Sequence, residues 1–247
     1  MLMRLQDKHI VITGASKGLG KALALRFTEE GASVALCARS QSELDDVKQE
    51  IHSANPSARV ITHVCDIADA KQVDAFVQTV VKEFGSVDVL VNNAGALGPR
   101  VPIAEYPPEE WERVVQTNLN GTYYFTHKVV PGMIKQKSGA IINVTSTVGK
   151  TGRAKWGAYA VSKFAIEGMT QVLSEELKSH NITVNSVNPG PLATEMRRQA
   201  YPTEDQSYLR KPEEVTDVFV YLASAEGTGI SGQWFDAANY YAPKEIK

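Results

Sequence analysis

The chain has 247 residues, of which 43% are hydrophobic and 22% charged, and its formal net charge is −2. This composition predicts a globular protein with a sizeable core and gives no charge excess that would attract nucleic acid or an anionic membrane. Two cysteines, Cys37 and Cys65, lie in apolar runs, which argues against a disulfide framework. Because we find no apolar leader and no run of roughly 18 apolar residues, we expect a cytoplasmic protein.

Short β-branched runs alternate with longer amphipathic stretches along the whole chain, a pattern typical of a parallel sheet with crossover helices. The sequence predicts seven strands, at 9–13, 33–38, 59–64, 87–91, 140–144, 182–187 and 233–235. Helices are predicted at 19–30, 42–52, 70–84, 109–133, 157–179 and 212–223, the fourth interrupted near 118–121. No repeat or linker divides the chain. We therefore expect one domain over residues 1–247, a three-layer α/β/α fold of Rossmann type with a doubly wound, seven-stranded parallel sheet.

A glycine-rich turn follows the first predicted strand, and a helix begins directly after it. Glycines allow a tight turn and a close approach of the backbone to a pyrophosphate, whose charge the helix N-terminus stabilises. A glycine cluster can be a turn and nothing more, but the strand before it and the helix after it favour a dinucleotide site. The spacing is GxxxGxG, which differs from the GxGxxG of common dehydrogenases. The expected cofactor contacts here are Gly14, Ser16, Lys17, Gly18, Leu19 and Gly20.

The end of the second predicted strand indicates which dinucleotide binds. NAD-binding folds usually carry a carboxylate there, which accepts a hydrogen bond from the ribose 2′-hydroxyl. This strand ends in Cys37-Ala38-Arg39 instead. Arg39 can bind a 2′-phosphate through two hydrogen bonds, with Lys17 as a second cation. Either charge alone is commonly a solvated surface group, but both at these positions predict NADP(H) in preference to NAD(H).

Polar residues also follow the third and fourth strands. Asp66 can accept a hydrogen bond from the adenine amino group, although a carboxylate there can instead cap the next helix, a role for which Asp69 is better placed. The run at 92–95, Asn-Asn-Ala-Gly, lies at the carboxyl edge of the sheet, where this fold binds ligands, but a plain turn would explain it as well. The expected contacts are Asp66, Ile67, Asn92, Ala94 and Gly95.

Four residues form a candidate catalytic group. Tyr159 and Lys163 are four apart and share a helix face. A free phenol has a pKa near ~10, and a nearby ammonium would lower it toward the range useful in proton exchange. Ser146, just past the fifth strand, can place a hydroxyl beside the reacting oxygen. Asn118 interrupts a long helix, and a carbonyl freed there can hold a water that links Lys163 to solvent.

The chain resembles the classical short-chain dehydrogenase/reductase family along its whole length. The resemblance rests on TGxxxGxG at 13–20, NNAG at 92–95, Asn118, Ser146, Tyr159 with Lys163, and Asn188-Pro189-Gly190 followed by Thr194. It implies a catalytic tetrad of Asn118, Ser146, Tyr159 and Lys163, with Lys163 also binding the nicotinamide ribose. It further implies that the ribose and carboxamide contact Asn92, Pro189, Gly190, Leu192 and Thr194. The family's usual dimer or tetramer, packed through two long helices, is implied too.

Two departures from the family pattern bear on the substrate. The segment at 191–212, which forms the substrate lid in the family, is shorter than in many relatives, so we expect a more open pocket. Members that reduce acyl chains on a carrier protein tend to show arginines near the ends of the interface helices. The corresponding residues here are Pro131 and Glu175, which weakens the case for a substrate bound to a carrier protein.

The segment between Ser146 and Tyr159 must border the pocket, because both of its ends lie at the reacting centre. Arg153 and Lys155 can contact an anionic substrate group and Trp156 can form an apolar wall, as can Leu97 and Met196. The alternative is that these charges are solvated or face another subunit. The five histidines show no metal-ligand spacing, so no metal is predicted.

Three functions are consistent with these patterns. The first is an NADPH-dependent carbonyl reductase, or the reverse alcohol dehydrogenase, with Tyr159 as general acid/base. The second is a reductase of 3-oxoacyl thioesters carried by a protein or by CoA. The third, from a different class, is a non-catalytic module that senses NADP(H). The tetrad argues against the sensor, which has no need of Ser146 and Tyr159 beside the nicotinamide.

Overall fold

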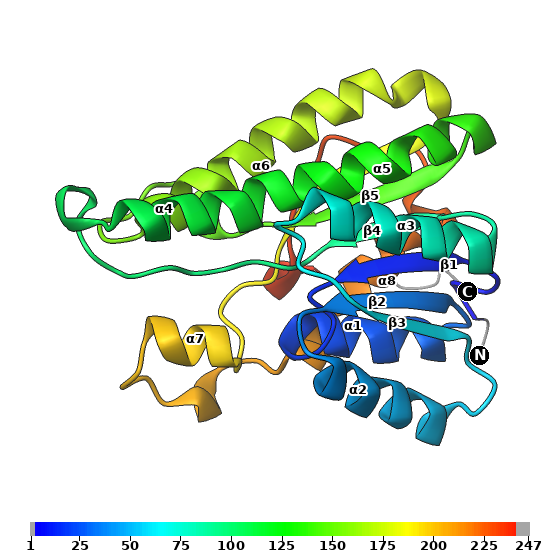
Figure 1. Ribbon diagram of the computed structural model, residues 1–247, viewed down its shortest axis with the longest axis horizontal. Coiled ribbons are helices and arrows are strands. Elements are labelled where there is room, and N and C mark those ends of the chain that lie inside the picture. Colours follow the sequence, from blue (N-terminus) through cyan, green and yellow to red (C-terminus); the bar gives the residue numbers. More distant parts are fainter. Residues whose placement is uncertain (1–2, 241–247) are drawn as a thin grey trace.

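The computed structural model describes residues 3–240, so the predicted domain of 1–247 extends beyond the described residues at both ends. Its core is a seven-stranded sheet in which every neighbouring pair is parallel and the strand order is β3-β2-β1-β4-β5-β6-β7 (Figure 1). The strands are β1 His9–Thr13, β2 Ser33–Ala38, β3 Val60–Val64, β4 Val89–Asn92, β5 Gly139–Val144, β6 Ile182–Asn188 and β7 Trp234–Asp236. The predicted α/β fold is confirmed.

The helices are α1 Gly18–Glu29, α2 Gln41–Ala54, α3 Ala70–Phe84, α4 Pro108–Val115, α5 Gly121–Gln136, α6 Gly157–Glu176, α7 Glu195–Ala200 and α8 Asp217–Ala223. They cover both faces of the sheet, with α5 and α6 above it and α1 and α2 below it in Figure 1. One core cluster packs α1, α2 and α8 on the sheet through side chains such as Phe27 and Phe219, and the other packs α3 and α5 through Phe76 and Phe125. Among residues 3–240, none of the helices combines the length and the hydrophobicity that a transmembrane helix requires.

The predicted helices form, one predicted interruption is confirmed, and two segments differ from the prediction. The interruption near 118–121 is real, because a π-helical turn, Gln116–Asn120, separates α4 from α5. The predicted helix at 212–223 begins too early, since Pro212–Val215 forms a tight 3-10 turn and α8 starts at Asp217. A short helix, α7, lies within the segment 191–212, where the sequence predicts no helix. Asp69 caps α3, as expected, by accepting from the backbone N–H groups of Lys71 and Gln72.

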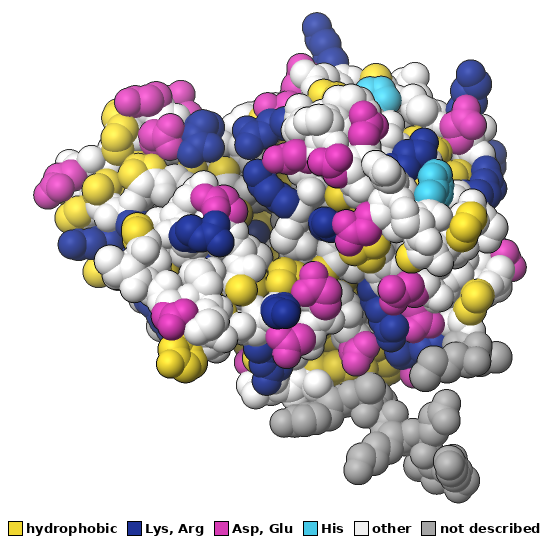
Figure 2. Space-filling model, turned by 90° about the horizontal axis from the view of Figure 1, so that it is seen from below, with side chains coloured by type: hydrophobic (Ala, Val, Ile, Leu, Met, Phe, Trp, Pro, Cys, Tyr) yellow, Lys and Arg dark blue, Asp and Glu magenta, His cyan; other side chains and the backbone are white. Residues whose placement is uncertain are grey.

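Surface charge is mixed rather than segregated by sign. Figure 2 shows cationic and anionic side chains interspersed over the face seen from below. This arrangement agrees with the formal net charge of −2. It offers no broad field of one sign on that face.

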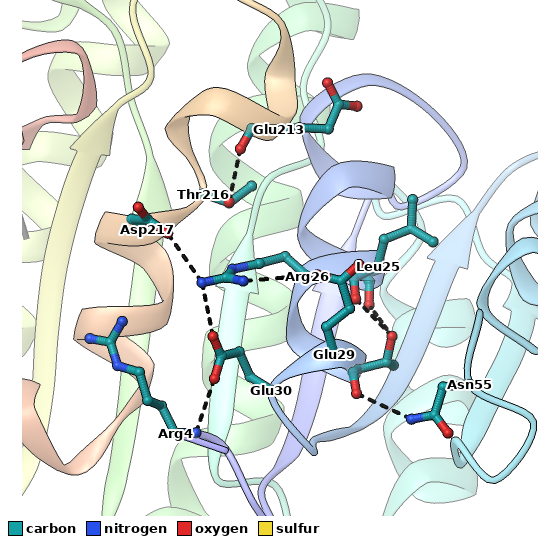
Figure 3. A network of polar contacts seen from close by, with 11 residues as sticks. Arg4, Leu25, Arg26, Glu29, Glu30, Asn55, Glu213, Thr216 and Asp217 are labelled. Carbon is teal, nitrogen blue, oxygen red and sulfur yellow. Dashed lines mark hydrogen bonds and ion pairs between the residues drawn. The ribbon is translucent and has the colours of Figure 1, made fainter. Parts of the chain in front are cut away.

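A polar network joins α1 to the N-terminal segment and to α8 (Figure 3). The Arg26 guanidinium lies 2.8 Å from a carboxylate oxygen of Glu30 and 3.3 Å from one of Asp217. The other Glu30 oxygen accepts from the backbone N–H of Arg4 at 3.0 Å. The Glu30 side chain is only 11% exposed, so these partners take the place of most of the water around its carboxylate.

We predict that Arg26→Ala lowers the free energy of unfolding by about 1–3 kcal/mol, because it leaves the nearly buried Glu30 carboxylate without its cation. Urea unfolding at neutral pH measures the change. The control is Arg113→Ala, which removes an exposed pair with Glu110 inside α4 and should change the stability by less than about 0.5 kcal/mol. Equal losses in the two variants would contradict the role given to the network.

Candidate active site

A cavity of about 870 Å³ opens at the carboxyl edge of the sheet, between the turns that follow the strands and the segment around α7. Parallel strands direct all of these turns to one edge, which is why residues far apart in the sequence meet there. The predicted site residues that line the cavity are Gly14, Ser16, Lys17, Gly18, Leu19, Arg39, Asp66, Ile67, Ala94, Gly95, Leu97, Ser146, Arg153, Trp156, Tyr159, Lys163, Gly190, Leu192, Thr194 and Met196.

Four predicted residues do not line it: Gly20, Asn92, Asn118 and Pro189. Gly20 serves packing, because a side chain there would begin 2.2 Å from the Gly14 carbonyl oxygen. Asn92 is expected to contact the cofactor, but its side chain does not line the cavity. Its side chain is buried and donates to Asn143 at 2.9 Å, so it faces the interior.

The neighbouring Asn93 lines the cavity instead. Its side-chain amide donates to the carbonyl oxygens of Thr13, at 2.8 Å, and Gly14, at 3.1 Å. Successive side chains of a strand point to opposite faces, so the end of β4 directs one asparagine inward and the next toward the turn. Asn93 therefore fixes the glycine-rich turn to the end of β4, a role that the sequence reasoning missed.

The glycine-rich turn has the shape that a dinucleotide phosphate needs. Gly14 and Gly18 have φ values of +64° and +55°, and a side chain at Gly14 would begin 2.8 Å from the Ala94 backbone. No side chain caps the start of α1, and its first turn holds no acidic residue. Its first N–H groups are therefore available to an anion, and the residues present fit a pyrophosphate.

Cationic and anionic side chains both line the cavity beside this turn. Lys17 and the exposed Arg39 line it, as the sequence predicts, but so does Glu43 from the first turn of α2. A Glu43 oxygen accepts from the Ser16 hydroxyl at 2.7 Å, and the other lies 3.6 Å from the Lys17 ammonium. The Ser16 hydrogen bond, followed by the charges of Lys17 and Arg39, lowers the pKa of the Glu43 carboxyl. The only local signal for Glu43 is the S-x-x-E pattern at 40–43, which is typical of helix caps.

The candidate catalytic side chains Ser146, Tyr159 and Lys163 come together on one wall of the cavity. Burial raises the pKa of Tyr159 to about 12, against a hydrogen bond with Ser146 that lowers it. Burial lowers the pKa of Lys163 to about 8, against the charge of Glu167 that raises it. The Lys163 amine donates to the Val144 carbonyl at 2.7 Å and lies 5.7 Å from the centre of the Tyr159 ring.

These shifts differ from the sequence expectation that Lys163 lowers the Tyr159 pKa. Desolvation of the buried phenol is the dominant cause of its raised pKa, and the Lys163 amine donates to the Val144 carbonyl rather than to the phenol. At neutral pH Tyr159 is therefore a protonated phenol, able to donate its proton to an acceptor in the cavity.

Asn118 supports this wall from behind. Its side-chain oxygen accepts from the Ala96 N–H at 2.6 Å, and its amide donates to the Ala96 carbonyl at 2.9 Å and to the Ser162 hydroxyl at 3.0 Å. The amide thus ties the turn after β4 to α6. The Asn118 carbonyl, expected to be free for a water, accepts from the Thr122 hydroxyl at 2.8 Å.

Trp156 and Tyr201 line the cavity, and a guanidinium packs against both rings. The Arg100 guanidinium lies 4.8 Å from the Trp156 ring and 4.3 Å from the Tyr201 ring, and it donates to the Ala200 carbonyl at 2.5 Å. Arg153 lines the cavity and has no ion pair within residues 3–240, whereas Lys155 is exposed outside it. Neither Arg100 nor Tyr201 was predicted from the sequence. Within the same residues, no group of three or more metal-ligating side chains comes together.

Comparison with known proteins gives the class. The short chain dehydrogenase family matches residues 8–205, and the chain belongs to this family of oxidoreductases. It is 38% identical over 239 residues to the 3-oxoacyl-[acyl-carrier-protein] reductase FabG of Thermotoga maritima, a match covering 94% of this chain and 96% of the relative. It is 35% identical over 237 residues to the uncharacterized oxidoreductase YciK of Escherichia coli, covering 94% and 92%.

The fold agrees with this assignment. A crystal structure of a short chain dehydrogenase from Shigella flexneri complexed with NADP superposes with a TM-score of 0.92 at 34% identity, covering 96% of this chain and 100% of that one. The family resemblance inferred from the motifs is therefore confirmed.

We predict that the buried Lys163 makes stability depend on pH. Its pKa is about 8 in the folded chain and near 10.5 when exposed, so the folded chain binds fewer protons across this window and the free energy of unfolding rises with pH. Relative to Lys163→Met, the wild type should gain roughly 2–3 kcal/mol between pH 7 and pH 10 in urea unfolding. The same comparison with Lys135→Met, an exposed site at the end of α5, should show no such gain. A difference from Lys163→Met that does not vary with pH would refute this account.

Proposed function

We propose that the chain is an NADP(H)-dependent oxidoreductase that transfers hydride between the nicotinamide and a carbonyl or secondary alcohol, with Tyr159 as general acid/base. The observation that carries the proposal is the meeting of the glycine-rich turn with Ser146, Tyr159 and Lys163 in one cavity. The NADP in the Shigella flexneri relative supports the choice of cofactor. A cytoplasmic location, expected from the sequence, belongs to the same proposal.

The proposed cofactor contacts follow the cavity from one end to the other. The turn at Gly14 and Gly18, with the N-terminus of α1, would hold the pyrophosphate. Asp66 and Ile67 would contact the adenine, and Lys163 the nicotinamide ribose. The remaining contacts to the ribose and carboxamide would come from Ala94, Gly95, Gly190, Leu192 and Thr194.

When bound, the cofactor would supply or accept the hydride, and the chain's own residues manage the proton. In the reducing direction the Tyr159 hydroxyl donates its proton to the carbonyl oxygen of the substrate, while Ser146 donates a hydrogen bond to the same oxygen. The positive charge of Lys163 stabilises the phenolate that remains on Tyr159, because few water molecules screen the two charges at this wall of the cavity. Asn118 holds the neighbouring turn in place through its bonds to Ala96.

Features of the chain also bear on the two alternative functions, a thioester reductase and a non-catalytic sensor. Reduction of 3-oxoacyl thioesters is supported by the name of the Thermotoga relative, whereas Pro131 and Glu175 stand where carrier-binding arginines would be expected. A non-catalytic NADP(H) sensor would gain nothing from a protonated phenol beside Ser146 in the cavity. The placement of Tyr159 therefore favours an enzyme.

The proposal includes a homo-oligomer, a homotetramer or dimer packed through the two long helices. The support is a set of large apolar side chains that α5 and α6, which cover the same face of the sheet in Figure 1, leave exposed. A monomer would present these side chains to water, whereas a packed pair of helices would bury them. They are Tyr123, Val161, Phe164 and Val172.

We predict that Tyr159→Phe abolishes turnover while leaving NADPH affinity nearly unchanged, because the ring keeps its packing and loses only the transferable proton. The assay follows NADPH absorbance with a panel of ketones, aldehydes and 3-oxoacyl thioesters, and a separate titration measures NADPH binding. A variant with wild-type kcat would refute the mechanism.

A keto acid and its methyl ester, both included in the panel and tested also with Arg153→Ala, show whether the enzyme prefers a substrate that carries an anionic group.

For the cofactor, we predict that Arg39→Asp reverses the preference toward NADH. The new carboxylate repels the 2′-phosphate and can accept from the 2′-hydroxyl, and losing the charge-assisted bond should cost about 1.5–3 kcal/mol, or roughly tenfold or more in affinity. Titrations of both dinucleotides measure the change. An unaltered preference in Arg39→Asp would show that Arg39 does not bind the phosphate.

A further inference from the structure

Glu43 brings a negative charge to the part of the cavity where a 2′-phosphate would bind. Its carboxylate accepts from the Ser16 hydroxyl at 2.7 Å and lies 3.6 Å from the Lys17 ammonium, and it lines the cavity together with Arg39. The Ser16 hydroxyl is thus already donating, and one of the two nearby cations already has an anionic neighbour.

The position of this carboxylate is not explained by helix capping. In a capping box the glutamate side chain accepts from the backbone N–H of the cap residue, here Ser40. Only the first half of the box forms, in which the Ser40 hydroxyl accepts from the Glu43 N–H at 3.3 Å. The Glu43 carboxylate instead extends across to Ser16, 27 residues earlier in the sequence. The side chain is therefore directed into the cavity rather than back along α2.

The charges decide how this carboxylate acts on a ligand. The Lys17 side chain is 67% exposed and that of Glu43 41%, so the ion pair between them is solvated and weak, and a bound phosphate could replace it. A doubly charged phosphate near Glu43 would nevertheless be repelled, and it would compete with Glu43 for Lys17 and Ser16. A 2′-hydroxyl at the same place carries no charge and can donate to the carboxylate, as it does to the acidic residue of NAD-binding folds.

We propose that Glu43 determines specificity at the ribose of the adenosine, opposing the 2′-phosphate of NADP(H) and accepting a hydrogen bond from the 2′-hydroxyl of NAD(H). The cavity then binds both dinucleotides. Lys17 and Arg39 make the affinity for NADP(H) the higher of the two, and Glu43 reduces the difference between the two affinities. This inference rests on the proposed function, because it assumes that a nicotinamide dinucleotide binds in the cavity.

The test is calorimetric titration of the full chain with NADPH and NADH, and with adenosine 2′,5′-bisphosphate and AMP, which isolate the adenosine end. Glu43→Gln keeps the size of the side chain and removes its charge. We expect it to bind NADPH and the bisphosphate roughly 3–10-fold more tightly, and NADH and AMP about 2–3-fold more weakly. The matched control is Glu50→Gln, which removes a carboxylate of the same helix that pairs with Lys21 outside the cavity, and which should change none of the four affinities.

The possible outcomes separate the two proposals. Unchanged or weaker NADPH binding in Glu43→Gln overturns the role of Glu43, as does a wild type that binds NADPH more than roughly 100-fold more tightly than NADH. Equal gains in Glu43→Gln and Glu50→Gln also overturn it, because they would reflect net charge alone. A wild type that binds neither NADPH nor NADH contradicts the proposed function instead.

Discussion

The pairing of β1 with β4 is the constraint on which the site depends. These strands are separated by two complete strands in the sequence but lie side by side in the sheet, with Ile10, Val11 and Ile12 in register with Val89, Leu90 and Val91. The order of strands changes direction at this pair, so the turns that follow β1 and β4 leave a space between them. Asn93 closes the base of that space by bonding to the β1 turn.

Burial is the second physical determinant of the site, and it acts in opposite directions on its two titratable groups. It disfavours the charged form of each, so the Tyr159 pKa rises and the Lys163 pKa falls. The phenol thus keeps its proton at neutral pH, and the amine lies close to its own titration range. Ser146 beside the phenol opposes the rise in the Tyr159 pKa, and a hydrogen bond to the Val144 carbonyl holds the Lys163 amine at the cavity wall.

The sequence was informative where chemistry depends on local pattern. The strand periodicity, the glycine-rich turn and the spacing of Tyr159 and Lys163 each lie within a short stretch of chain, and the structure has each as predicted. The resemblance to a known family predicted that these separate segments form one site. Even the interruption of the long helix could be inferred, since asparagine is a poor residue for a helix interior.

What the sequence could not supply depends on partners that are distant along the chain. Glu43 is placed by Ser16, and Arg100 by Ala200, so neither side chain has a local signal for its position. Which of the two asparagines, Asn92 or Asn93, faces the cavity depends on the alternation of side chains at the end of the strand. A shift of one residue there moves a side chain from the protein interior to the cavity. The Tyr159 pKa depends on solvent exposure, which no spacing of residues reveals.

The guanidinium of Arg100 has a consequence for how this chain can diversify. One planar cation lies against Trp156, which precedes α6, and against Tyr201, which follows α7, and the two rings also lie 6.2 Å apart. Replacement of any of these three side chains therefore disturbs both segments at once. Because Trp156 and Tyr201 line the cavity, a single substitution among the three can change the range of molecules that the cavity admits.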